Sequence, residues 1–208
     1  MELIEQSWKW IRKPEGALEL IELAGRTCYK SENKITPESS LNFNRRIKIS
    51  GHHSVIEHAV ATVKFITDRG VTHELVRHRL ASYSQESTRY CNYGNGHIKF
   101  IKPVWLDIPC EVYERNSPDF GLIEHTFIES MLLAEIQYKL LLTCGQRPEQ
   151  ARQVLPNSLK TEIVITANLR EWMHIFNLRC SLAAHPQIRE LMISCREGFR
   201  KEVPILFD

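Results

Sequence analysis

The chain has 208 residues, of which 43% are hydrophobic and 25% are charged. This composition is that of an ordinary globular protein and excludes collagen-like, low-complexity and largely disordered chains. Lysine and arginine total 27 against 25 acidic residues, which argues against a dedicated nucleic-acid-binding protein with its usual basic excess. The length predicts a single domain over residues 1–208.

Hydrophobic periodicity and breaker residues predict a mixture of strands and helices. In chain order, strands are expected at residues 2–8, 59–68, 97–101 and 161–167, with an irregular segment or short edge strand at 82–89. Helices are expected at residues 14–27, 36–50, 72–77, 117–143, 148–154, 169–180 and 186–200. Because strands and helices do not alternate as β-α-β units, we expect an α+β fold with an antiparallel sheet packed against long helices.

Three local signals refine these boundaries. Gly51 is expected to end the helix at 36–50, since glycine is favoured just past a helix end. Ser54 to Glu57 has the spacing of a capping box, and Thr72 is expected to cap the helix that ends near Arg77.

The six cysteines form no C-x-x-C pair, and their spacing matches no zinc-binding pattern. Residues 1–10 lack the pattern of a signal peptide, and no apolar run reaches the length of a membrane span. We therefore expect a cytoplasmic protein with reduced thiols that binds neither a membrane nor a nucleic acid.

The densest cluster of polar side chains lies between Arg77 and Tyr90. Guanidinium groups bind phosphate through paired hydrogen bonds, and serine hydroxyls add neutral donors. Arg77 and Arg79 diverge on a helix but share one face of an extended chain. The spacing is compatible with two interpretations, to which we give about equal weight. The segment either binds an anion or is a solvated cationic helix end.

Three more arginines stand out. Arg152 lies among apolar neighbours, while Arg170 and Arg179 begin and end the helix expected at 169–180. A separation of nine residues places Arg170 and Arg179 on opposite faces of that helix, with Asn168 and His174 closer to the face of Arg170. For each of these three arginines, an ion pair with Glu149 or Glu171 is a simpler interpretation than ligand binding.

The histidines do not have the spacing of a metal site, and we expect no bound metal. His52 and His53 remain candidates for a ligand contact, beside the simpler interpretation of hydrogen-bonded loop histidines. For the cysteines we expect buried, unreactive thiols, because no neighbouring base is evident.

Two alternative functions stay open on the residues alone. Cys110 would be the nucleophile of a cysteine-dependent transferase. Arg77 to Arg89, interleaved with Tyr83, Tyr90 and Tyr93, would form a groove for single-stranded nucleic acid.

Arg77-His78-Arg79, seven further residues and Ser87 resemble the hallmark motif of the flavin-dependent thymidylate synthases. The likeness continues through Thr88-Arg89-Tyr90. Three other segments match the family in order: 51–58, 151–156 and 168–179. The resemblance covers about residues 24–189, and ordered motifs over this length are specific.

The resemblance implies a homotetramer with active sites shared between subunits. It implies conversion of dUMP to dTMP with FAD, with methylenetetrahydrofolate supplying the methylene and NADPH the reducing equivalents, and without a cysteine nucleophile. Shared sites would also explain how one helix can use arginines on opposite faces. The chemistry is that of the flavin, for which the protein supplies orientation and electrostatics.

The resemblance also assigns site residues. The flavin-binding residues that it implies are Ser54, Arg77, His78, Arg79, Gln85, Asn168, Arg170 and His174, with His52 nearby. The dUMP-binding residues that it implies are Glu74, Arg77, Gln85, Glu86, Ser87, Thr88, Arg89, Arg152 and Arg179. Arg179 matches the residue that activates the pyrimidine by stabilising charge at its N3/O2 edge, and Ser87 matches a hydroxyl that positions the ligand.

Overall fold

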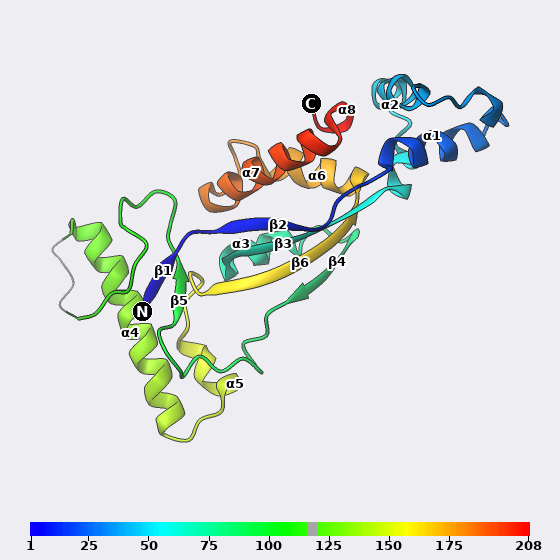
Figure 1. The fold of residues 1–208 in the computed structure, drawn as a ribbon. Coiled ribbons are helices and arrows are strands. Elements are labelled where there is room, and N and C mark those ends of the chain that lie inside the picture. The colour runs from blue at the N-terminus through cyan, green and yellow to red at the C-terminus, as the bar shows by residue number, and fades with distance from the viewer. Residues whose placement is uncertain (116–119) are drawn as a thin grey trace. The chain divides into compact units, whose positions relative to one another are not determined.

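The computed structural model describes residues 1–115 and 120–208 (Figure 1). The chain divides into two compact units. Unit 1 comprises Met1–Ser7, Phe65–Val76 and Ser84–Ile163, and unit 2 comprises Trp8–Lys64, Arg77–Tyr83 and Val164–Asp208. The single domain expected from the chain length stays a prediction.

A four-stranded sheet has the strand order β2-β3-β6-β4. Its strands are β2 (Ser7–Arg12), β3 (Val60–Asp68), β4 (Ala81–Gln85) and β6 (Lys160–Asn168). Along the chain, β2 and β6 lead from unit 1 into unit 2, whereas β3 and β4 lead from unit 2 into unit 1. Hydrogen-bonded neighbours are therefore antiparallel, as predicted, and the segment at 82–89 supplies an edge strand.

The alternation expected for strand 59–68 is confirmed. Burial in β3 changes at every residue, with Val63 and Phe65 fully buried on one face. A period of two places successive side chains on opposite faces of a sheet. β6 repeats the same alternation.

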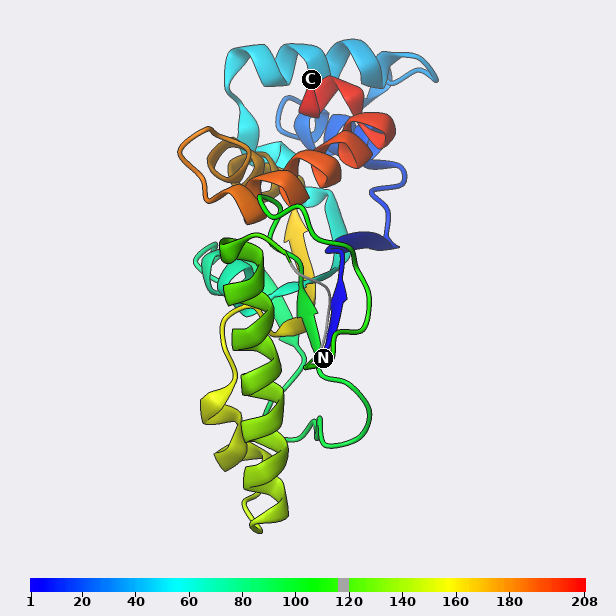
Figure 2. The ribbon, with the colours of Figure 1, turned by 90° about the vertical axis from the view of Figure 1, so that its left-hand side faces the viewer.

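Unit 2 holds most of the helices. They are α1 (Ala17–Thr27), η1 (Glu32–Lys34), α2 (Ser39–Ser50), η2 (His53–His58), α6 (Leu169–Arg179), α7 (Pro186–Glu202) and α8 (Pro204–Phe207). Trp172 of α6 is fully buried, donates a hydrogen bond from Nε1 to the Ala61 carbonyl, and stacks on Phe176. Phe199 of α7 packs against the same rings, and α8 lies beside α2 (Figure 2).

Unit 1 is built around β1 (Glu2–Ile4), β5 (Lys99–Ile101) and α4 (Leu122–Thr143). It also contains α3 (Arg69–Leu75), α5 (Pro148–Ala151) and η3 (Arg152–Val154). Its core joins Leu3 and Phe100 of the strands to Met131 and Tyr138 of α4. The start expected for this longest helix, at Ser117-Pro118, lies outside the described residues.

The β1–β5 pair departs from the antiparallel prediction, because the two strands run parallel from Glu2↔Lys99 to Ile4↔Ile101. Only antiparallel strands can be joined by a tight hairpin, whereas parallel pairs need a long connection. The sequence separation between β1 and β5 supplies such a connection.

One predicted helix signal is confirmed and two are wrong. Gly51 ends α2 with a positive φ of 73°, as expected. Ser54 does not cap a helix, because the chain forms the short 3₁₀ helix η2 there and enters β3 at Val60. Asp68, not Thr72, caps α3 by accepting a hydrogen bond of 2.6 Å from the Val71 amide.

Candidate functional site

The R-H-R motif lies in unit 2, in the turn and extended segment before β4. His78 is buried, with 4% of its surface exposed, while Arg77 and Arg79 on either side are exposed. That the two arginines share a face stays a prediction, while His78 is buried within unit 2.

His78 is held by three groups of unit 2. Its Nε2 accepts a hydrogen bond of 3.1 Å from Nε of Arg179. Its Nδ1 lies 3.6 Å from Oε1 of Glu171, and Tyr83 donates a 2.6 Å hydrogen bond to its backbone carbonyl. Since a neutral imidazole has one donor and one acceptor nitrogen, this arrangement places the hydrogen on Nδ1, facing Glu171.

Electrostatics keep this imidazole neutral. Burial, assisted by the charges of Arg179 and His174, lowers the pKa of His78 to about 4. Burial also raises the pKa of the Glu171 carboxyl, which the charge of His174 opposes, and raises the pKa of Tyr83 to about 12. His78 therefore accepts a hydrogen bond from Arg179 without neutralising the guanidinium charge.

The other arginine of α6 has different neighbours. Arg170 forms an ion pair of 2.5 Å with Glu57, and both side chains are largely exposed. Asn168 caps α6 by accepting a 2.8 Å hydrogen bond from the Glu171 amide. As the helical spacing predicts, Arg170 and Arg179 have separate partners.

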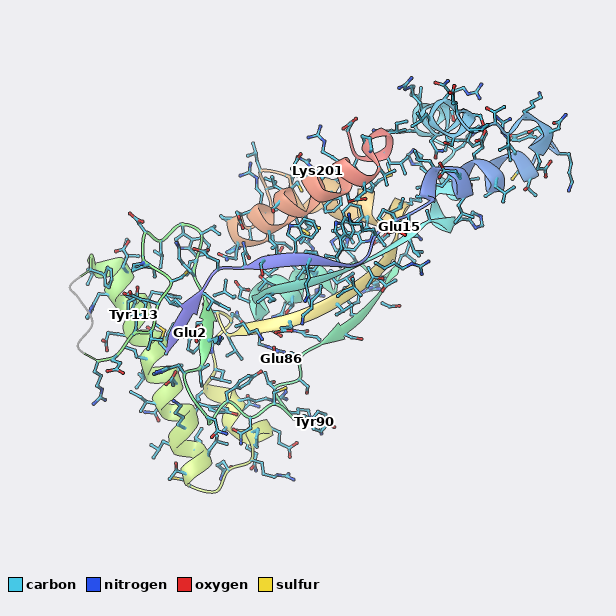
Figure 3. The ribbon with its side chains drawn as sticks, in the orientation of Figure 1. Glu2, Glu15, Glu86, Tyr90, Tyr113 and Lys201 are labelled. Atoms are coloured by element: carbon cyan, nitrogen blue, oxygen red, sulfur yellow. The ribbon has the colours of Figure 1, made fainter. Side chains whose placement is uncertain are left out.

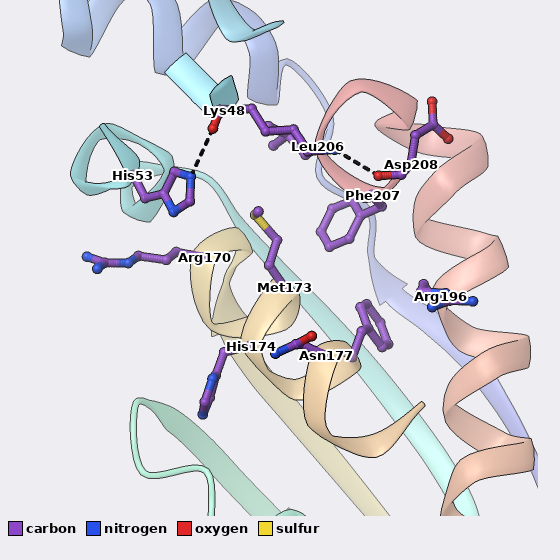
Figure 4. Close-up of a pocket in the computed structure, with 11 residues that line it drawn as sticks. Lys48, His53, Arg170, Met173, His174, Asn177, Arg196, Leu206, Phe207 and Asp208 are labelled. Atoms are coloured by element: carbon purple, nitrogen blue, oxygen red, sulfur yellow. Dashed lines mark hydrogen bonds between the residues drawn. The ribbon is translucent and has the colours of Figure 1, made fainter. Parts of the chain in front are cut away.

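Three pockets of unit 2 share Arg170, and we call them the Arg170 pockets. Figure 4 shows the first, of about 500 Å³, which His174, Met173, Arg196 and Phe207 also line. The second, of about 470 Å³, contains His52, His53 and Ser54 beside Phe43. The third, of about 370 Å³, contains Asn168 and His174.

The Arg170 pockets thus bring together four of the predicted flavin-binding residues: Ser54, Asn168, Arg170 and His174. Sequence reasoning missed Lys48 and Arg196, which reach the first pocket from α2 and α7. The buried Nε of Arg196 has no hydrogen-bond partner among the described residues. No pattern within the sequence near 168–179 indicates either residue.

Two predicted ligand-binding residues are engaged inside unit 1. The amide group of Gln85 donates hydrogen bonds of 2.9 and 3.2 Å to the hydroxyls of Thr72 and Thr161. Glu86 accepts hydrogen bonds of 2.8 Å from Tyr93 and 3.0 Å from Lys160. Both side chains fix the segment that follows β4.

The next residues form a turn. The Ser87 hydroxyl accepts a 3.3 Å hydrogen bond from the Arg89 amide, and the buried Thr88 hydroxyl accepts one of 3.0 Å from Arg152. Arg89 lies 3.7 Å from Glu149 and over the ring of Tyr90. Tyr90 is 79% exposed and lies at the outer surface of this segment (Figure 3).

Arg152 and Thr88 also line a pocket of about 380 Å³ in unit 1, which we call the Arg152 pocket. Arg69, His73 and Asn157 line it too, and no acidic side chain is among the described residues that line it. Nη1 of Arg69 is buried without a hydrogen-bond partner in the described part of the chain. Guanidinium groups without a carboxylate suit a phosphate group.

Sequence reasoning missed Arg69 and His73. Their separation of four residues, on one face of α3, was a usable signal. Glu74, predicted to bind dUMP, lies on α3 and is partly exposed, but it is not among the residues that line the Arg152 pocket.

The structure argues against the cysteine-dependent alternative, whereas the nucleic-acid alternative stays untested. Cys28, Cys110 and Cys144 are exposed, so the expectation of buried thiols is wrong for these three. The Cys110 thiol donates a hydrogen bond to Glu5, and partial desolvation together with that bond raises its pKa to about 11, so it is a poor nucleophile at neutral pH. Tyr83 and Tyr93 donate hydrogen bonds to protein acceptors and are only partly exposed. Tyr90, the third tyrosine of that hypothesis, is 79% exposed.

Within residues 1–115 and 120–208, no group of three or more His, Cys, Asp or Glu side chains is arranged to hold a metal ion. Over the same ranges, no helix combines the length and apolar character needed to cross a bilayer.

Comparisons with known proteins cover nearly the whole chain. The family model described as "Thymidylate synthase complementing protein" matches residues 9–205. The chain is 36% identical to the flavin-dependent thymidylate synthase of Mycobacterium avium (strain 104), with 95% of this chain and 81% of that protein aligned. It is 34% identical to the enzyme of the same name from Corynebacterium glutamicum, covering 96% and 82%.

A solved structure is also similar. It is the UMP/dUMP methylase PolB from Streptomyces cacaoi bound with 5-Br dUMP, with a TM-score of 0.79 and 23% identity. The alignment covers 100% of this chain and 95% of that one. At this identity the likeness bears on the fold alone.

Proposed function

The chain belongs to the family of flavin-dependent thymidylate synthases, and we propose that it is an enzyme that reductively methylates dUMP to dTMP. In this proposal FAD is the cofactor, methylenetetrahydrofolate donates the one-carbon unit and NADPH is the reductant. The observation that carries the proposal is Arg179 of the family's C-terminal motif, which is hydrogen-bonded to the central histidine of the R-H-R motif.

The residues of the Arg170 pockets fit a flavin dinucleotide. Arg170, His174 and Ser54 offer donors to a pyrophosphate, and Phe43, Met173 and Phe207 offer apolar walls to aromatic rings. The unpartnered Nε of Arg196 is a further donor that a bound anion would satisfy. Asn168, Arg77 and Arg79 complete the proposed set, and Gln85, whose NH₂ group is engaged, would contact a ligand through its Oε1.

When bound, FAD would carry reducing equivalents from NADPH to the reaction. The chain's part is to bind and orient. In the Arg152 pocket, Arg69, Arg152 and Thr88 would bind the dUMP phosphate, with Ser87 and Arg89 in the adjoining turn. Charge-assisted contacts of this kind are stronger than neutral hydrogen bonds and fix the nucleotide's position.

Arg179 would act on the pyrimidine. As C5 of dUMP gains a carbon substituent, negative charge develops at the N3/O2 edge, and a guanidinium held in advance stabilises that charge without reorganising. Because His78 is neutral, the positive charge of Arg179 is retained for this purpose. No cysteine nucleophile is needed in this proposal.

We extend the proposal to a cytoplasmic homotetramer whose subunits share active sites. This proposal is supported by the two arginines of α6, which have different partners. Arg170 pairs with Glu57, and Arg179 donates a hydrogen bond to His78. Large apolar side chains are also exposed on the helices, with Leu133 of α4 at 54% and Ile49 of α2 at 81%.

The experiment is a dTMP-formation assay on purified protein reconstituted with FAD. We expect product only when FAD, NADPH, methylenetetrahydrofolate and dUMP are all present, and we expect Cys110→Ser to retain activity. Product formation without flavin, or none from protein that holds flavin and is given all substrates, would contradict the proposal.

A further inference from the structure

We propose that His78 and Glu171 are positioning residues for Arg179, and that the His78 ring is not a ligand of the flavin. The inference rests on the proposed function, because it concerns how Arg179 is held for its task. It reassigns the middle residue of the R-H-R motif, which the resemblance counts among the flavin-binding residues.

The first step is access. Only 4% of the His78 surface is exposed, whereas its neighbours Arg77 and Arg79 are exposed. One ring nitrogen accepts from Arg179, and the other faces the Glu171 carboxylate at 3.6 Å. Both polar atoms of the ring are therefore directed at protein groups of unit 2.

The second step is the effect on Arg179. A guanidinium group is planar and rigid. The 3.1 Å hydrogen bond uses Nε–H, the donor nearest to the side-chain stem. Fixing that donor fixes the plane of the group and hence the direction of its two Nη groups.

The third step is the tautomer. A carboxylate facing Nδ1 keeps the ring hydrogen on that nitrogen and leaves Nε2 as an acceptor. Glu171 is itself placed by the N-cap of α6, where its amide binds Asn168. Tyr83 holds the His78 backbone from β4. His78 thus connects Glu171, near the start of α6, to Arg179 at its end.

The fourth step is the pH dependence that this geometry requires. The titratable and charged groups facing the ring are Glu171, His174 and Arg179 from α6 and Tyr83 from β4. A proton on Nε2 would turn two donors toward each other and break the contact with Arg179. Orientation of Arg179 should therefore be lost when His78 becomes protonated.

The test compares His78→Phe, which removes the acceptor but keeps a ring, with His78→Gln, which restores an acceptor oxygen. We expect His78→Phe to retain FAD as the wild type does while kcat falls about 10- to 100-fold, the range known for residues that orient metal-ligating histidines. His78→Gln should recover part of kcat and lose the acid limb of the pH profile. His125→Phe, an exposed histidine of α4, is the matched control and should change nothing.

Two results would overturn the proposal: an unchanged kcat in His78→Phe, or a loss of FAD from that variant with kcat restored by excess FAD. If His78→Phe fails to fold, Glu171→Gln and Glu171→Leu replace it, and we expect the leucine variant to lose more kcat.

A measurement that does not depend on turnover distinguishes failure of this proposal from failure of the proposed function. Nitrogen NMR of the wild type should show the His78 proton on Nδ1 and a protected Arg179 Nε–H. The opposite tautomer would overturn the positioning role even in an active enzyme. A wild type with the expected signals that forms no dTMP would instead contradict the proposed function alone.

Discussion

Arg179 in unit 2 and the arginines of the Arg152 pocket in unit 1 differ in how their guanidinium groups are held. In unit 2, Arg179 is hydrogen-bonded to a buried, neutral imidazole that is itself backed by Glu171. In unit 1, Arg152 donates to the Thr88 hydroxyl, and a guanidinium nitrogen of Arg69 has no partner in the described part of the chain. One cation is oriented by the protein, whereas the others are available to a ligand.

The difference matches two chemical tasks. A group that stabilises developing charge must be in place before the reaction, since reorganisation adds to the barrier. A group that binds a phosphate gains its partner when the ligand arrives. Until then, a buried donor left unpaired costs roughly 1–3 kcal/mol, which a bound phosphate would offset.

The largest effect is expected when Arg179, the arginine that the protein orients, is removed. Arg179→Ala should lower dTMP formation by about 10²- to 10³-fold, as removal of a preorganised donor does. Flavin content and Tm should stay near those of the wild type, because the side chain is only half-buried at the end of α6. Steady-state kinetics and a thermal melt check this, and full turnover in the variant would show that Arg179 has another role.

The next effect concerns the Arg152 pocket. Arg152→Ala should raise KM for dUMP about 10- to 100-fold, the equivalent of one charge-assisted contact, with a smaller change in kcat. Arg69→Ala should act in the same direction. Binding of deoxyuridine, which has no phosphate, is the control, and an equal loss of deoxyuridine binding would place the effect elsewhere.

A smaller effect concerns pH and stability. His78 has a pKa of about 4 in the folded chain against 6.5 for an unperturbed histidine, so the unfolded chain takes up its proton first. Its contribution to stability is complete above pH 6.5 and is lost as the pH falls toward 4. Glu171, whose pKa is raised, acts with the opposite sign. Urea unfolding should therefore show a steeper loss of stability in the wild type than in His78→Gln, and equal slopes would contradict this assignment.

The smallest effect is expected at Cys110. Its thiol is protonated at neutral pH, so Cys110→Ser should change kcat by less than about 2-fold, well under the cost of losing a catalytic nucleophile. Loss of turnover in this variant would revive the cysteine-dependent mechanism.

Much of this fold could be predicted from sequence because short stretches of residues determine the strands and the helix ends. Strand alternation predicted β3 and β6, and Gly51 and Pro186 marked helix boundaries that the structure has. The capping predictions failed at Ser54 and Thr72 because helix type and competing acceptors decide a cap, and Asp68 is one such acceptor. The parallel pairing of β1 with β5 is a long-range choice that neither strand encodes alone.

The candidate site likewise contains residues that local sequence predicts and contacts that depend on residues far apart in the chain. The R-H-R motif and Arg152 could be recognised from residue type and spacing. The contact between His78 and Arg179 joins residues 101 positions apart, and burial of one imidazole between two arginines that stay exposed is a tertiary property. The same holds for Arg196, which reaches the first Arg170 pocket from α7.

The most direct test of the account is a flavin absorption titration with dUMP in the wild type, Arg170→Ala and Arg152→Ala. We predict that the wild type retains FAD and shows a dUMP-induced spectral shift. Arg170→Ala should lose FAD, whereas Arg152→Ala should retain FAD and shift only at much higher dUMP concentration. The reverse pattern, with FAD lost from Arg152→Ala and the dUMP response weakened only in Arg170→Ala, would contradict the division of tasks between the Arg170 pockets and the Arg152 pocket.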